Sequence, residues 1–60
     1  MISFAKQDGD IVAVFDERGQ QVFWKVGELL GYTANTVTIK DGSYIHVYNE
    51  QGREQFSKHV

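Results

Sequence analysis

The 60-residue sequence contains no cysteine and no proline, only two histidines, and no apolar run longer than five residues. Without cysteine the chain has no disulfide framework and no thiolate zinc site, and two histidines alone do not close a structural metal site. An apolar run of this length is far too short for a membrane-spanning helix or for the core of a signal peptide. We therefore expect a soluble cytoplasmic protein without disulfides, metal ions, cofactors or membrane contact.

The sequence also lacks a strong excess of either charge and lacks catalytic motifs. Six basic and eight acidic residues are scattered along the chain, and the net charge of −2 disfavours nucleic acid as a partner. The sequence shows no glycine-rich phosphate loop, no nucleophile elbow and no metal-ligand spacing. A chain this short also leaves little room for a pocket of about 300–1,000 Å³, so we expect no catalytic residues and no enzyme.

What the chain does contain is a similarity between two of its segments. The segments Asp8–Lys25 and Asp41–Lys58 align without gaps at an offset of 33 residues, and seven of the eighteen aligned positions are identical. An internal repeat explains this similarity, and a shared demand for hairpin turns explains it equally well. In both cases we expect one small β domain spanning residues 1–60, with halves at about 1–26 and 34–60 and a linker at 27–33.

Each half is predicted to be a three-stranded antiparallel meander. Asp8-Gly9 and Asp41-Gly42 suit two-residue type I′ turns, since glycine and aspartate tolerate positive φ. Asp16–Gly19 and Asn49–Gly52 suit type I turns in which glycine takes the left-handed position of a G1 bulge. The strands rich in β-branched and aromatic residues between these turns are Ile2–Lys6, Ile11–Phe15, Gln21–Val26, Thr36–Lys40, Tyr44–Tyr48 and Arg53–Ser57.

The two kinds of turn determine which side chains share a face of each meander. The predicted register sets Lys6 opposite Ile11 and Ala13 opposite Phe23. The core face of the first half is then expected to hold Ile2, Phe4, Ile11, Ala13, Phe15 and Phe23. The core face of the second half is expected to hold Val37, Ile39, Tyr44, His46, Tyr48 and Phe56. The opposite face of the first half is apolar as well and holds Ala5, Val12, Val14, Val22 and Trp24.

The fold class that follows is all-β. Six antiparallel strands in two meanders predict a small barrel or sandwich, because three strands alone do not bury a face. Dimerisation is a second way to complete such a core, with strands exchanged between chains. The linker contains Leu29 and Leu30, and Gly31 suits the end of a single helical turn. Either these leucines or a second chain would cover the side of the first half that lies opposite its predicted core face.

Two short pieces of the sequence resemble known β-repeat units. The pieces VFDERGQQVFW and VYNEQGRE resemble the hairpins of YD/Rhs-type and WG-type repeat proteins, which share a strand–Asp/Asn-x-x-Gly–strand pattern. The likeness covers about eight to twelve residues per half and follows from turn chemistry. We carry no function over from it.

An exposed apolar surface is the strongest functional signal in the sequence. Val12, Val14, Val22 and Trp24 are the predicted interaction surface, since tryptophan is enriched in binding hot spots. The leading hypothesis is a small, non-enzymatic protein–protein interaction module that self-associates as a homodimer or binds another protein.

An anion-binding surface is the alternative hypothesis. Lys6, Lys25 and Lys58 are predicted at one end of the core face, with Lys58 over Tyr44 as a cation–π pair. Such a rim would bind single-stranded nucleic acid or another anionic ligand. The alternative is that these lysines have no binding role and that their aliphatic stems only cover the end of the core. His46 is expected to be partly buried with a local hydrogen-bond partner, or else to be a pH-sensitive group at an interface.

Overall fold

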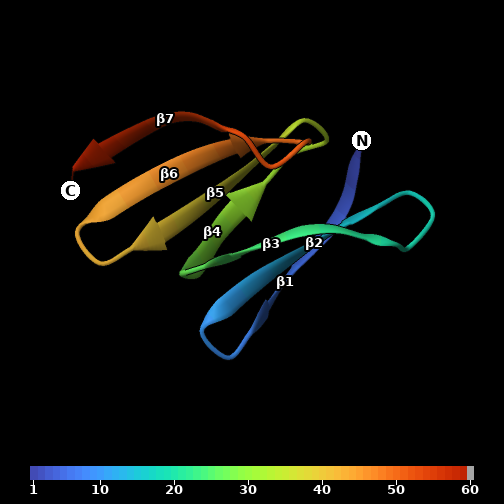
Figure 1. Cartoon of the computed structure of the whole chain (residues 1–60), viewed down its shortest axis with the longest axis horizontal. Coiled ribbons are helices and arrows are strands. Elements are labelled where there is room, and N and C mark those ends of the chain that lie inside the picture. The colour runs from blue at the N-terminus through green and yellow to red at the C-terminus, as the bar shows by residue number, and fades with distance from the viewer. Residues whose placement is uncertain (60) are drawn as a thin grey trace.

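The computed structural model describes residues 1–59, which form seven antiparallel strands in two open sheets (Figure 1). Sheet 1 has the order β1 (Ile2–Asp8), β2 (Ile11–Asp16) and β3 (Gln21–Val26). Sheet 2 has the order β4 (Glu28–Tyr32), β5 (Thr36–Asp41), β6 (Tyr44–Asn49) and β7 (Glu54–His59). The all-β class is confirmed. Val60, the last residue of the predicted second half, lies outside the described range.

The closed six-stranded barrel is wrong for the described residues. β3 and β4 follow one another in the chain but belong to different sheets, and each sheet keeps its own two edges. The sheets pack on each other where β1 and β2 of sheet 1 meet β4 of sheet 2. The solvent-accessible surface of 3985 Å² is about what a monomer of 6.9 kDa exposes, so both sheets are folded against each other within one chain.

The seventh strand, β4, lies in the predicted linker. Residues Glu28–Tyr32 pair with β5 instead of forming a helical turn, and a register shift at Leu30 bends the strand. This pairing covers the edge of β5 and lets Leu29 pack against the core, while Leu30 points outward. A helical turn would have left that edge without backbone partners.

The two-residue turns differ from the predicted type. Asp8 pairs with Ile11 and Asp41 with Tyr44, so glycine is the first central residue of each turn. Gly9 has a φ of 63° and Gly42 has a φ of 64°, which is the type II′ arrangement. The predicted type I′ turns are therefore wrong, and Lys6 lies opposite Ala13 instead of Ile11. A shift of two residues leaves the assignment of faces unchanged.

The longer turns have the predicted G1 bulge. Gly19 and Gly52 take φ values of 80° and 86°, and their amides donate to the carbonyl oxygens of Asp16 and Asn49 at 3.0 Å. The side chains of Asp16 and Asn49 accept two further backbone hydrogen bonds each, which closes the turn.

A second bulge follows each of these turns and was not predicted. In β3 the pairing shifts between Val14 and Phe15, so that Val22 is an extra residue and Phe23 lies opposite Val14. In β7 the equivalent shift makes Gln55 the extra residue. Because one extra residue turns every following side chain to the other face, β3 beyond Val22 faces the opposite way from the prediction.

The core lies between the sheets, and the core predicted for each half is correct only in part. In sheet 2, Val37 and Ile39 are fully buried, as predicted, whereas the predicted core residues Tyr44 and Phe56 are exposed. In sheet 1, Val12 and Val14 are fully buried, whereas the predicted core residue Phe4 is exposed. A further register shift within β1, between Ile2 and Phe4, lets Ile2 turn inward. The other side chains packed in this core are Ala5, Phe23, Leu29 and Tyr48.

The junction between the sheets depends on Gln7 and Gly27. The Gln7 amide group donates to three carbonyl oxygens, including that of Gly27 at 2.9 Å, and its oxygen accepts from the Leu29 amide at 2.7 Å. Gly27 has a φ of 144°, and a Cβ there would lie 2.5 Å from the Ile39 side chain. Only glycine fits this close approach of the two sheets.

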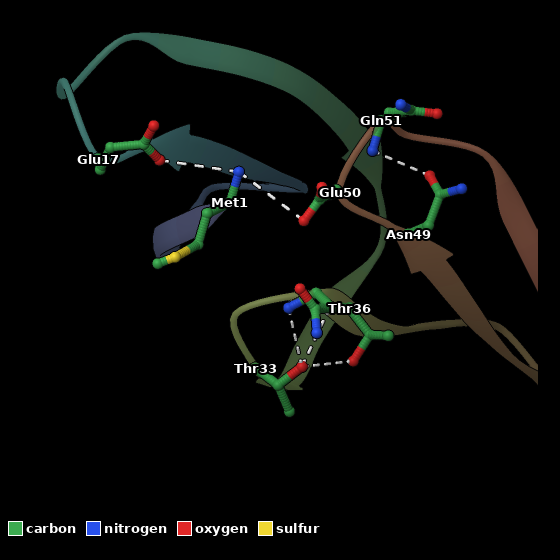
Figure 2. Close-up of polar contacts among 8 residues, drawn as sticks. Met1, Glu17, Thr33, Thr36, Asn49, Glu50 and Gln51 are labelled. Carbon is green, nitrogen blue, oxygen red and sulfur yellow. Dashed lines mark hydrogen bonds and ion pairs between the residues drawn. The ribbon is translucent and has the colours of Figure 1, made fainter.

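The far end of the molecule brings three turns together around the chain terminus. The Met1 amine is 3.7 Å from a carboxylate oxygen of Glu17 and 3.7 Å from one of Glu50. Figure 2 shows the amine between these two carboxylates. Nearby, the hydroxyls of Thr33 and Thr36 are 2.9 Å apart in the turn between β4 and β5. In residues 1–59 we find no helix with the length and apolar character needed to cross a bilayer.

Candidate functional site

The outer face of sheet 1 points away from sheet 2 and carries apolar side chains from all three strands. We call it the apolar face, and it consists of Phe4, Ile11, Ala13, Phe15, Trp24 and Val26. Trp24 is 53% exposed, Val26 is 56% exposed and Phe4 is 47% exposed. Large aromatic and aliphatic side chains that share one face of a small sheet form an interaction surface more often than scattered ones do.

The shape of the apolar face follows from its cross-strand pairs. At its centre, Ala13 lies between Lys6 on β1 and Trp24 on β3. The small Ala13 side chain is only 3% exposed between these larger neighbours. The Phe4 and Phe15 rings lie 5.9 Å apart beside a hollow of about 320 Å³. The face therefore offers both a projecting indole and a recess.

The predicted interaction surface is only partly on this face. Val12 and Val14 are buried between the sheets, so they cannot form an exposed contact surface. Val22 and Trp24 are exposed as predicted, but the bulge at Val22 turns Trp24 to the opposite side from Val12 and Val14. The predicted four-residue surface is therefore wrong as a unit.

Five of the six members of the apolar face were not predicted to lie on an outer surface: Phe4, Ile11, Ala13, Phe15 and Val26. The prediction placed the first four on the core face and left Val26 at a strand end. The sequence gives no positive signal for this face. The run Ile11–Phe15 is apolar at every position, so its pattern does not determine which alternate residues face inward.

The predicted anion rim is not brought together. Lys6 lies over the Phe15 ring at 6.0 Å on the outer face of sheet 1, and Lys25 lies over the Tyr48 ring at 4.9 Å between the sheets. Lys58 pairs with Ile45 on the outer face of sheet 2, whereas Tyr44 pairs with His59 on its inner face. The bulge at Gln55 separates Lys58 from Tyr44. With its lysines on three different faces, the proposed rim does not form a phosphate-binding groove.

A second notable surface is a line of rings on the inner face of sheet 2, which runs along β6 from the edge of the core to its exposed end. We call it the aromatic row, and it consists of Tyr44, His46 and Tyr48. Neighbouring ring centroids are 6.2 and 6.0 Å apart, and the ring planes are inclined by 30° and 28°. The row follows from the strand itself, because alternate residues of a strand share a face.

Polar groups surround the aromatic row. The Nδ1 atom of His46 is 2.6 Å from a carboxylate oxygen of Glu54, which gives this histidine the local partner that was predicted. Burial raises the pKa of the Tyr48 hydroxyl above its usual value, and the negative charges of Glu54 and Asp41 raise it further. The row therefore lies in a region of negative potential.

Comparison of the chain with protein-family models, curated proteins and solved structures found no match. The apolar face of sheet 1 and the aromatic row of sheet 2 are the two surfaces on which a function can be argued.

Proposed function

We propose that the protein is a small, non-enzymatic protein–protein interaction module that self-associates through the apolar face of sheet 1. The observation that carries this proposal is the exposure of Phe4, Trp24 and Val26 on one side of a three-stranded sheet. Full burial of an exposed side chain of this kind gains about 1.5–3 kcal/mol. Since these three are already about half buried, covering the rest of each gains roughly half of that, which favours a second surface over them.

A second copy of the same face is the occupant that fits best. In a two-fold arrangement each residue of one copy meets the same surface of the other copy. With the axis near Ala13, the indole of Trp24 from each copy can enter the hollow beside Phe4 and Phe15 of the other. The single central charge, Lys6, keeps its ammonium at the margin through its long stem.

The size of the face predicts weak association. Three strands of about six residues span roughly 15 Å by 20 Å, or about 300 Å² per copy. Stable dimers bury about 800 Å² per partner, so the sheet face alone supplies less than half of that area. We expect a dissociation constant above about 10 µM and fast exchange between monomer and dimer.

The test is sedimentation equilibrium on the full chain at concentrations up to about 1 mM, with two matched charge substitutions. Trp24→Glu introduces a charge on the apolar face, and Phe56→Glu introduces the same charge at an equally exposed aromatic residue on the outer face of sheet 2. We expect Trp24→Glu to abolish the concentration dependence of the mass and Phe56→Glu to preserve it. A wild-type chain that stays monomeric up to that concentration, or equal effects of the two substitutions, would exclude this function.

We infer further that the two meanders are tandem copies of one ancestral unit. Support comes from the offset of 33 residues, which relates the two type II′ turns, the two G1 bulges and the extra residues Val22 and Gln55. On this view, sheet 2 gained β4 from the linker, while sheet 1 kept three strands and an uncovered outer face.

A further inference from the structure

The aromatic row already binds one cation that belongs to the protein. The ammonium group of Lys25 reaches across from β3 and lies 4.9 Å from the centroid of the Tyr48 ring. A ring face attracts a cation within about 6 Å, and the attraction grows where carboxylates lie nearby. Glu54 and Asp41 supply that negative charge around Tyr48.

Tyr44 presents a similar ring four residues earlier on the same strand, and this ring is exposed. Tyr44 and Tyr48 project from the same face of β6, and Tyr44 is 49% exposed. Within residues 1–59, the lysine ammonium groups that lie over rings are those of Lys25 on Tyr48 and Lys6 on Phe15. The Tyr44 ring is therefore available to a cation from outside the chain.

The surroundings of Tyr44 match what an organic cation requires. The His59 ring stands at 74° to the Tyr44 ring with the centroids 5.0 Å apart, so the two rings make an edge-to-face contact. Asp41 is the cross-strand partner of Tyr44 on β5 and shares its face of the sheet. Exposed aromatic rings beside a carboxylate are well suited to bind alkylated ammonium groups.

We propose that Tyr44, His59 and Asp41 form a binding site for an organic cation, either the side chain of a partner's lysine or arginine or a small quaternary ammonium ligand. The charges around the row favour this class over phosphates. Asp41 and Glu54 provide two negative charges, whereas the nearby lysine, Lys25, is already placed on Tyr48. The site lies on sheet 2 and does not depend on association through sheet 1.

The primary experiment is a titration of the wild-type chain followed through the ring resonances of Tyr44 in carbon–proton correlation spectra. The probes are tetramethylammonium chloride and, separately, a peptide with capped ends whose single charge is that of one arginine, each up to about 100 mM. Sodium chloride at equal ionic strength and neopentyl alcohol, a neutral molecule of similar shape, are the controls. We expect saturable shifts at Tyr44 with the cationic probes only, and the stronger probe identifies the source of the cation.

Three substitutions test the proposed contacts. Tyr44→Phe keeps the ring and should preserve binding, whereas Tyr44→Leu should abolish the saturable shift of the His59 ring. Asp41→Asn should weaken binding about two- to fivefold. Tyr32→Leu, at the other exposed tyrosine, is the matched control and should leave binding unchanged.

The wild-type titration decides the question even where a variant fails to fold. Shifts that do not saturate, shifts equal to those from sodium chloride, or equal binding of neopentyl alcohol would overturn the proposal. Binding of a single-stranded oligonucleotide with saturable shifts at Tyr44 would also overturn it, since the site would then favour anions.

Discussion

The two G1-bulge glycines allow the docking of the sheets to be measured by one matched pair of substitutions. Gly19 and Gly52 have φ values of 80° and 86° and make the same hydrogen bond to the first residue of the turn. Alanine in this left-handed conformation costs about 1–2 kcal/mol at either position. The backbone penalty is therefore the same for Gly19→Ala and Gly52→Ala.

Their surroundings differ in one respect. A Cβ at Gly19 would meet no atom of residues 1–59 within 4 Å, whereas a Cβ at Gly52 would lie 3.0 Å from Cγ and 3.4 Å from Cβ of Phe23. Phe23 belongs to sheet 1 and Gly52 to the last turn of sheet 2, so this contact exists only when the sheets are docked. The near end of the Phe23 side chain cannot swing away, and overpacking of this kind costs a further 1–3 kcal/mol, roughly.

We expect Gly52→Ala to lower the melting temperature by at least about 4 °C more than Gly19→Ala, since 1 kcal/mol corresponds to about 4–8 °C in a domain of this size. Urea unfolding followed by circular dichroism gives the same comparison at constant temperature. A domain of 60 residues has only about 3–9 kcal/mol of stability, so the difference is large enough to measure. In a Phe23→Ala background the difference should disappear. Equal losses in the wild-type background would show that Phe23 does not pack on this turn.

Two further predictions concern the sheet junction and the partly buried Tyr48. Gln7→Leu removes the acceptor of the Leu29 amide and the hydrogen bonds across the junction. We expect it to lower the free energy of unfolding, measured in urea, by about 1–3 kcal/mol. Gln51→Leu in an exposed turn is the control and should change this free energy little. Because the folded state raises the pKa of Tyr48, the unfolded state loses this proton first, and stability should fall as the pH rises above about 10. Tyr48→Phe should make that fall shallower and Tyr32→Phe should not; an unchanged slope in Tyr48→Phe would contradict the assigned effect of burial.

The two longer turns could be predicted because single residues determine them. Asp16, Gly19, Asn49 and Gly52 specify the G1 bulges, and these are present as expected. The segment Thr36–Lys40 alternates between polar and apolar residues, so its inward face at Val37 and Ile39 was also predicted correctly.

The faces of sheet 1 could not be predicted for a physical reason. All five residues of Ile11–Phe15 are apolar, so either alternate set is suited to a core. The smaller, β-branched Val12 and Val14 fill the flat space between the sheets, and the larger Phe15 remains partly outside. The extra residue Val22 then places the side chains that follow it in β3 on the opposite side of the sheet from the one predicted. No turn residue in the sequence indicates this bulge. The candidate surface therefore depended on packing between sheets, which local patterns do not encode.

The bulge at Val22 makes the sides of two rings depend on the register of one strand. Phe23 lies opposite Val14 and Trp24 lies opposite Ala13, and opposite residues share a side of the sheet. Loss of the codon for Val22 would remove the irregularity and keep both rings on their present sides. A slip of β3 that places Val22 opposite Val14 would instead turn the phenyl ring toward solvent and the indole toward the interior. One unchanged amino-acid sequence would then present a different outer surface, so the backbone register determines where the tryptophan is displayed.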